Sequence, residues 1–223
     1  MCDDTVGTFV NVDILAEVDI LCTSLTKMFS GACNVMGGST VLNPRSRRYN
    51  ELKSAVSALF TDTYFPADAA IMEANSRDFT TRMERANANA EEVCGLLKRH
   101  RSVAKVHYPK DSSTQALYDA FKRPRGGYGY LLSVVFSDPE GAIAFFDSLD
   151  VAKGPSLGTN FTLGCPYTLF AHYGEREWAA QYGVVEDLVR ISIGLEDWCV
   201  IRRKIEDALK AVDRVTAPTD QHY

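Results

Sequence analysis

The first 60 residues combine short apolar runs with polar and glycine-rich segments. Residues 9–22 carry the pattern of a short helix followed by a strand, which covers the apolar positions 18–22. A second strand is expected to close with the segment 41–44. The next segment, 45–59, has a mostly polar helical pattern. This part of the chain is therefore predicted to contain two strands and flanking helices.

A single apolar stripe follows a turn at 61–66. Pro66 is well placed to begin a helix, because proline is tolerated in the first helical turn. Apolar side chains then recur every three or four residues, at Met83, Ala86, Ala90, Val93 and Leu97. We expect one helical stretch from residue 66 to residue 100, which links the first part of the chain to a second domain.

Three further strands are expected in the second half of the chain. The segment 103–108 is closed by Pro109, and 130–136 is mostly apolar and has the pattern of a buried strand. The segment 188–193 alternates. Arg190 and Ser192 lie on one face, and the other face carries the apolar side chains of Val189, Ile191 and Ile193.

Helices and loops separate these strands. Residues 110–129 are polar and interrupted by glycines, a helix begins at Pro139, and 151–173 is irregular, with the character of an active-site loop. A C-terminal helix carries the stripe Trp198, Ile201, Ile205, Leu209 and Val212, and the tail from Thr216 is expected to be loose. Since strand and helix patterns alternate throughout, the predicted fold class is α/β or mixed α+β.

Composition and charge narrow the function classes. The chain of 223 residues is 46% hydrophobic and 24% charged, which is ordinary for a globular protein with a real core. Its net charge of -5, without a basic tail, argues against nucleic acid as a partner. No apolar run approaches the ~20 residues of a membrane span, and the N-terminus is not a signal peptide.

The six cysteines do not indicate a metal site. None of them forms a CxxC pair or a His–Cys cluster with zinc-ligand spacing. We interpret them as reduced thiols of a cytoplasmic protein, and we predict that the chain binds no metal.

The motif Ser24-Leu25-Thr26-Lys27 follows an apolar strand and precedes a glycine-rich turn. A lysine at the mouth of a strand suits a Schiff-base nucleophile, and the two hydroxyls could hold a phosphate. Pyridoxal phosphate (PLP) needs both an amine for its aldehyde and donors for its phosphate. In an extended segment the two hydroxyls would lie on one side and the lysine on the other. The same residues could instead be a solvated loop lysine and two helix-capping hydroxyls.

The wider sequence resembles the PLP-dependent enzymes of cysteine and methionine metabolism, the trans-sulfuration enzymes. The resemblance rests on TSLTKMFSGACNVMGGS at 23–39, DDT at 3–5, ANSRDF at 74–79, SLGTNFTL at 156–163 and LVRISIGLED at 188–197. It is strongest to the fungal cystathionine γ-synthase-like branch. It implies an α/β fold of the fold-type-I PLP-dependent transferases. The chain resembles the C-terminal half of such a protein and is expected to be truncated: part of the large PLP domain at 1–73, then a linking helix and the small α+β domain at 74–223.

The resemblance also implies a role for each site residue. Lys27 would hold PLP as a Schiff base and move protons between the α and γ carbons of the substrate. Ser24 and Thr26 would bind the phosphate. Asp3 would hydrogen-bond the pyridine nitrogen, with the adjacent Asp4 as its rival.

The substrate's α-carboxylate would be bound by Arg190, with a second contact from Ser156. A guanidinium grips a carboxylate through two parallel hydrogen bonds. An arginine at this place could also be a sheet-edge residue whose charged end reaches water.

The implied reaction is γ-replacement on an O-acylhomoserine, in which a thiol such as cysteine replaces the acyl group. Such a homo-oligomeric enzyme would serve methionine biosynthesis or a specialised fungal pathway. The alternative is a catalytically inactive fragment or an interaction module. In the family, the N-terminal half supplies a ring-stacking tyrosine and a glycine-containing phosphate loop, and this chain is expected to lack that half.

Overall fold

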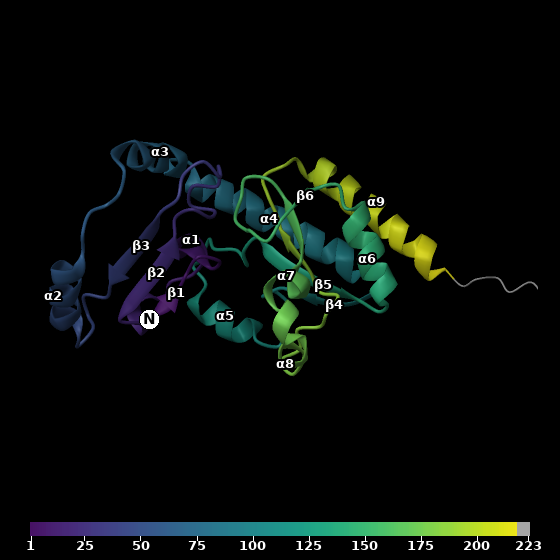
Figure 1. The fold of residues 1–223 in the computed structure, drawn as a ribbon, viewed down its shortest axis with the longest axis horizontal. Coiled ribbons are helices and arrows are strands. Elements are labelled where there is room, and N and C mark those ends of the chain that lie inside the picture. Colours follow the sequence, from purple (N-terminus) through teal and green to yellow (C-terminus); the bar gives the residue numbers. More distant parts are fainter. Residues whose placement is uncertain (218–223) are drawn as a thin grey trace, which may run out of the picture.

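The computed structural model describes residues 1–217 and contains two β-sheets connected by long helices (Figure 1). The first sheet has the order β1-β2-β3, with β1 at Cys2–Asp3, β2 at Ile20–Ser24 and β3 at Gly38–Leu42. β1 runs parallel to β2, and β2 runs antiparallel to β3. The short helix α1 (Thr8–Asn11) and a 3-10 turn (Leu15–Glu17) connect β1 to β2.

Three helices follow the first sheet: α2 (Tyr49–Leu59), α3 (Pro66–Ser76) and α4 (Phe79–Lys98). The prediction of one helical stretch from 66 to 100 is therefore wrong at residues 77–78. The helix is interrupted there because the carbonyl of Asn75 accepts a hydrogen bond of 2.7 Å from the Arg82 side chain. This bond replaces the one that a backbone amide of a continuous helix would donate to the same carbonyl.

The helix predicted from residue 45 begins only at Tyr49. Two side-chain turns precede it, since Asn43 Oδ1 accepts from the Arg45 amide (2.9 Å) and Ser46 Oγ accepts from the Arg48 amide (3.0 Å). Short polar side chains compete in this way with helical hydrogen bonds.

The second sheet has the order β4-β5-β8-β7-β6. Its strands are β4 (Val103–His107), β5 (Leu131–Phe136), β6 (Ala152–Lys153), β7 (Leu163–Pro166) and β8 (Val189–Ser192). All neighbouring pairs are antiparallel except β6 and β7. The three strands predicted in this half are confirmed, with ends that differ by at most one residue.

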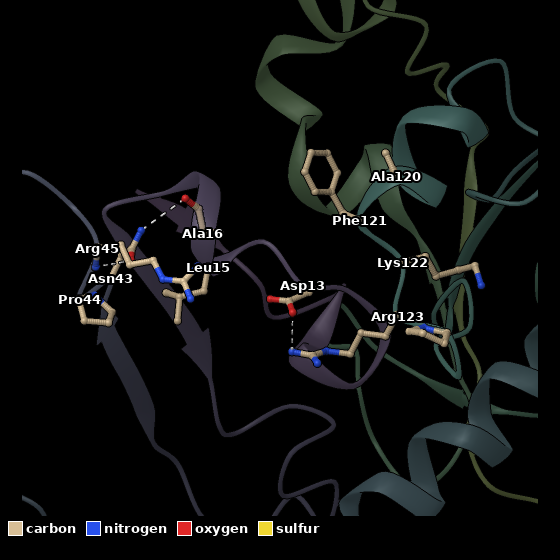
Figure 2. Close-up of a pocket in the computed structure, with 11 residues that line it drawn as sticks. Asp13, Leu15, Ala16, Asn43, Pro44, Arg45, Ala120, Phe121, Lys122 and Arg123 are labelled. Atoms are coloured by element: carbon tan, nitrogen blue, oxygen red, sulfur yellow. Dashed lines mark hydrogen bonds and ion pairs between the residues drawn. The ribbon is translucent and has the colours of Figure 1, made fainter.

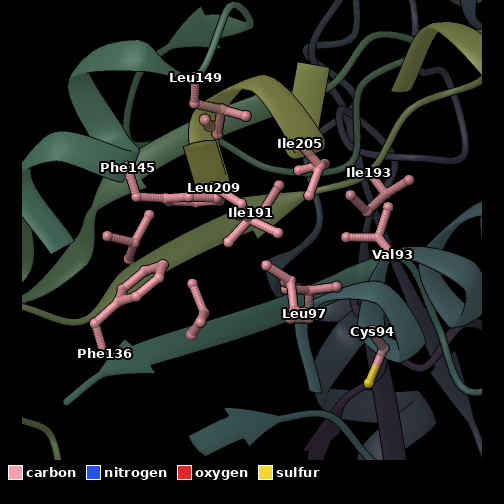
Figure 3. Close-up of a cluster of buried hydrophobic side chains, with 14 of the residues drawn as sticks. Val93, Cys94, Leu97, Phe136, Phe145, Leu149, Ile191, Ile193, Ile205 and Leu209 are labelled. Atoms are coloured by element: carbon pink, nitrogen blue, oxygen red, sulfur yellow. The ribbon is translucent and has the colours of Figure 1, made fainter. Parts of the chain in front are cut away.

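Helices α4, α6 (Pro139–Ser148) and α9 (Trp198–Thr216) pack together beside this sheet (Figure 1). Their apolar stripes meet the buried faces of β5 and β8 to form the main core (Figure 3). Its fully buried members include Val93, Leu97, Phe145, Ile191 and Ile205. The predicted C-terminal helix is confirmed. Residue 216 ends α9, and residues 218–223 of the predicted tail lie outside the described residues.

Two segments hold more structure than their patterns indicate. Helix α5 (Gln115–Phe121) lies in the polar stretch 110–129, and the supposedly irregular segment 151–173 contains β6, β7 and helix α7 (Tyr167–Ala171). A second 3-10 turn (Tyr173–Glu175) and helix α8 (Arg176–Ala180) follow. Helix α5 buries no residue and β7 is buried without alternation, so neither shows an amphipathic pattern.

Together, the strands and helices confirm the α/β class. Within residues 1–217, no helix is long and apolar enough to cross a membrane.

A smaller core lies at the junction of the two halves. Met28, directly after Lys27, packs with Phe79, Met83 and Ala86 of α4 and with Tyr130 before β5. These side chains are all buried, with Met28, Met83 and Tyr130 at 0% exposure. The turn after β2 is thereby held between the first sheet and the elements of the second.

Candidate active site

Lys27 lies in a tight turn that begins where β2 ends, at Ser24. The turn closes through the Ser30 amide, which donates to Leu25 O (3.0 Å), and the Gly31 amide, which donates to Lys27 O (2.7 Å). The expectation of an extended segment, with hydroxyls on one side and the amine on the other, is therefore wrong beyond Ser24. Backbone hydrogen bonds turn the chain after Ser24, so side chains beyond this residue no longer point to alternate sides as they do in a strand.

The two hydroxyls of the motif have different surroundings. Thr26 Oγ1 accepts a hydrogen bond from the Gly37 amide (3.0 Å) and donates to Gly37 O (3.3 Å), so it fastens the turn to the start of β3. Within residues 1–217, the Ser24 hydroxyl has no hydrogen-bond partner, and its amide donates to Thr5 Oγ1 at 2.8 Å. Neither hydroxyl caps a helix.

The amine of Lys27 reaches across to a segment far along the chain. Lys27 Nζ donates to Ser156 Oγ at 3.0 Å, and the two residues are 129 positions apart. The loop with Ser156 joins β6 to β7 and approaches closely at Gly158, which has φ +70°. A Cβ at this position would lie 2.9 Å from Lys27 Cβ and 2.7 Å from Met28 N. Only glycine tolerates both this conformation and this approach.

Arg190 meets the same loop from β8. Its Nη2 donates to the carbonyls of Pro155 and Ser156, the latter at 3.2 Å. Its guanidinium also lies over the ring of Tyr167, 4.8 Å from the centroid, in a cation–π contact. The structure thus brings Lys27, Ser156 and Arg190 together.

Asp3 ends β1 and pairs with Cys22, the middle residue of β2. Its exposed carboxylate accepts a hydrogen bond of 2.9 Å from the Thr5 amide. Hydrogen bonding from the side chain and amide of Thr5 lowers the pKa of Asp3, so this carboxylate is ionised at neutral pH.

Asp4 has the opposite environment. It is 2% exposed, and burial away from water, aided by the nearby charge of Asp3, raises its pKa to about 6. Within the described residues, its Oδ2 atom has no hydrogen-bond partner. Of the two neighbours, Asp3 presents the accessible carboxylate.

Several residues around the site were missed by the sequence analysis. Tyr130, fully buried, donates its hydroxyl to Thr5 O at 3.1 Å, and Tyr167 supports Arg190. Arg82 binds the carbonyls of Met28 and Phe29, directly after Lys27, at 2.7 Å each. None of the three had a sequence signal that separates it from an ordinary strand, loop or helix residue.

A separate pocket of about 570 Å³ lies at the other end of the first sheet (Figure 2). Arg45, Pro44 and Asp13 line it, and Arg123 pairs with Asp13 at 3.4 Å. Because β3 is antiparallel to β2, its end lies beside the start of β2, opposite the Lys27 turn. None of the predicted site residues lines this pocket.

The family model for Cys/Met metabolism PLP-dependent enzymes matches residues 1–210 of the chain. The chain belongs to this family. Its relatives include a cystathionine γ-synthase of Neurospora crassa, 52% identical over 95% of this chain and 34% of the relative. Another is the cystathionine γ-synthase-like protein ankD of Aspergillus thermomutatus, 49% identical over 96% of this chain and 38% of the relative.

Solved structures confirm the fold-type-I expectation. The chain is similar to cystathionine γ-lyase from yeast, with a TM-score of 0.80 and 26% identity over 94% of this chain and 55% of the other. The chain thus spans about a third of the length of the curated relatives and about half of this solved chain.

The family's cofactor is PLP, and the chemistry of the described residues fits it. A primary amine, an uncommitted hydroxyl at Ser24 and an ionised carboxylate at Asp3 lie at the ends of two adjacent parallel strands. Gly158 leaves the space beside Lys27 Cβ that a side chain would fill. PLP requires this combination of amine, phosphate donors and an acceptor for its ring nitrogen.

Proposed function

We propose that this chain carries the cofactor lysine and the carboxylate-binding residues of a trans-sulfuration enzyme of the cystathionine γ-synthase kind. The reaction would be γ-replacement on an O-acylhomoserine by a thiol such as cysteine, in methionine biosynthesis or a specialised pathway. The observation that carries this proposal is the convergence of Lys27 and Arg190 on one residue, Ser156: the amine binds its hydroxyl and the guanidinium its carbonyl. The two fungal relatives named above support the synthase assignment.

In this proposal Lys27 binds the cofactor, Asp3 accepts from its ring nitrogen and Ser24 donates to its phosphate. The Thr26 hydroxyl already forms two hydrogen bonds with Gly37. We therefore propose that Thr26 shapes the turn in addition to binding the phosphate. PLP, when bound, supplies an electron sink for negative charge at the substrate's α carbon.

Lys27 is also the proposed proton carrier. Once the substrate amine has displaced it, the free Lys27 amine would take the α proton and deliver a proton on the γ side as the acyl group leaves. The contact of 3.0 Å with Ser156 Oγ keeps this amine directed toward the loop where the substrate would lie.

Arg190 would bind the substrate carboxylate. Only Nη2 is used in its contacts with Pro155 and Ser156, and within the described residues Nε and Nη1 make no hydrogen bond. These N–H groups remain for an anion, and Tyr167 holds the guanidinium plane in place.

The two sheets support a division into a PLP-binding part at 1–73 and a C-terminal part at 74–223, with residue 73 inside α3. A homo-oligomeric assembly in the cytoplasm remains our prediction. The exposed apolar side chains at the end of α2 support self-association: Leu59 is 83% and Phe60 70% exposed.

The test of the cofactor role is chemical trapping. Protein incubated with PLP, reduced with borohydride and digested should give a pyridoxyl adduct on the Lys27 peptide in excess of the peptide with Lys53, an exposed lysine of α2. Lys27→Arg should abolish this adduct and leave the Lys53 adduct unchanged. Adducts on other lysines only would overturn the cofactor assignment for this chain.

The test of substrate binding titrates PLP-loaded protein with an amino-acid substrate and follows binding by the absorbance of the cofactor. Arg190→Ala should weaken amino-acid binding by ~10–100-fold, the loss of one charge-assisted contact of ~1.5–3 kcal/mol. Arg202→Ala is the matched control, because that arginine is exposed on α9 and, among the described residues, forms a salt bridge only with Glu206. Equal affinities in both variants would contradict the role of Arg190.

A further inference from the structure

Arg82 is a buried arginine whose five N–H donors are all in use. The residue is 6% exposed and lies in the first turn of α4. Its Nε donates to Asp78 Oδ1 at 2.7 Å, and its Nη2 donates to Asn75 O at 2.7 Å. Its Nη1 and Nη2 donate to Met28 O and Phe29 O, each at 2.7 Å. The fifth donor, on Nη1, reaches Asn160 Oδ1 at 3.1 Å.

These five bonds join three segments that are distant in sequence. One is the break between α3 and α4, the second is the turn with Lys27, and the third is the loop with Ser156. A guanidinium can do this because its donors point outward in one plane in a fixed geometry. A lysine has three donors on one nitrogen and cannot reproduce the arrangement.

The contact with the Lys27 turn is close and specific. Gly31, whose amide closes the turn on Lys27 O, has φ +70°, and a Cβ there would lie 2.5 Å from Arg82 Nη1. The Asn160 amide donates to Gly31 O at 2.8 Å, so the turn and the loop are bonded directly as well as through Arg82. The Lys27 backbone is thus held on its C-terminal side by Arg82 and Asn160.

We infer that Arg82 is a positioning residue: by binding Met28 O, Phe29 O and Asn160 together, it sets the Lys27 amine against the Ser156 loop. The inference rests on the proposed function of Lys27 for its chemical meaning. Arg82 itself touches neither the Lys27 amine nor Ser156. Its effect is on how often the amine is presented in reactive geometry, which a purely structural arginine would not control.

The experiment compares Arg82→Lys with Arg77→Lys in the full chain. Arg77 is the matched control, because it lies five residues away and, within residues 1–217, forms a salt bridge only with Glu73 at the surface. We expect Arg82→Lys to lower the ratio of Lys27 to Lys53 pyridoxyl adducts by about tenfold, as expected when charge-assisted hydrogen bonds are lost. Hydrogen exchange of the Gly31 amide should accelerate by a similar factor. Arg77→Lys should change neither.

A second pair of variants decides the question if Arg82→Lys does not fold. Asn160→Ala removes the acceptor for Nη1 and should lower the adduct ratio, whereas Asn160→Asp keeps an acceptor oxygen and should restore it. The inference is overturned if a folded Arg82→Lys variant shows an unchanged adduct ratio and unchanged exchange of the Gly31 amide. If Arg82→Lys does not fold, the same result for Asn160→Ala would overturn it. If the unmodified chain gives no Lys27 adduct, the proposed function fails, while Gly31 exchange still tests the positioning by Arg82.

Discussion

Asp3 and Asp4 are neighbours in the chain, but their carboxyl groups are in opposite electrostatic environments. The exposed Asp3 accepts hydrogen bonds from Thr5, which favours its ionised form. The buried Asp4 loses hydration and lies near the charge of Asp3, which favours its neutral form. A single step along the chain, from the last residue of β1 to the next, thus separates an accessible, ionised carboxylate from one that costs stability when it ionises.

The raised pKa of Asp4, about 6, predicts a pH-dependent stability. The folded state holds this proton more tightly than the unfolded state, so the free energy of unfolding should fall as pH rises from about 4 to 6 and then level off. Asp4→Asn removes this dependence. The difference in unfolding free energy between the Asp4→Asn variant and the unmodified chain should therefore increase with pH. It should reach ~2–3 kcal/mol in favour of the variant by pH 7.

Denaturant unfolding at several pH values measures this effect. Asp147→Asn, at an exposed position of α6, is the control and should show no such trend. A constant difference between Asp4→Asn and the unmodified chain across pH 4–7 would show that Asp4 titrates normally.

At the scale of elements, the loop between β6 and β7 determines what surrounds the Lys27 amine. It carries Ser156 to within 3.0 Å of Lys27 Nζ and supplies the two carbonyls that hold Arg190. The amide of Gly158 donates to Ser192 Oγ of β8 at 2.8 Å, which fixes the loop to the second sheet. The loop therefore couples the second sheet to the turn after the first.

Gly158→Ala should disrupt this coupling. The added Cβ meets Met28 N, Lys27 Cβ and Tyr130 Oη at 2.7–3.0 Å, and the φ of +70° is unfavourable for alanine. We expect a loss of ~1–3 kcal/mol in unfolding free energy, together with a reduced Lys27 pyridoxyl adduct. Gly154→Ala, in the same loop with nothing within 4 Å of its Cβ, should stay within ~0.5 kcal/mol of the unmodified chain. Thermal unfolding of both variants checks this, and equal effects would exclude the close approach as the cause.

At the scale of the whole molecule, the two sheets differ in how much core supports them. The second sheet packs against α4, α6 and α9 through fully buried side chains such as Ile191 and Ile205. In the first sheet only Leu21 is buried among the residues of its strands. Less apolar burial means a smaller free energy for local opening.

Native-state hydrogen exchange should therefore separate the two sheets. Amides of β2 and β3 should exchange through openings of lower free energy than amides of β5 and β8. Phe145→Ala, in the main core, should lower the protection of β5 and β8 by ~3–5 kcal/mol. Ile143→Ala, on the same helix but 60% exposed, is the control and should have little effect. A single protection level for both sheets would contradict this division.

The sequence by itself determined the features that depend on local order. The apolar runs and the stripe of α9 predict strands and a helix because side-chain periodicity follows backbone geometry. The Ser24–Lys27 motif indicated PLP chemistry, and the resemblance to the trans-sulfuration enzymes implied a carboxylate contact at Arg190; the family and its cofactor are confirmed. The individual residue roles stay predictions.

Only the tertiary structure decided how these pieces meet. Lys27 contacts Ser156 across 129 positions, and no local pattern encodes a partner at that separation. Arg82 resembles any polar residue on a helix, yet its side chain takes the carbonyl of Asn75, breaks the expected single helix and binds the Lys27 turn. Hydrogen bonds between distant segments depend on packing in three dimensions, whereas periodicity reports only which face of an element is buried.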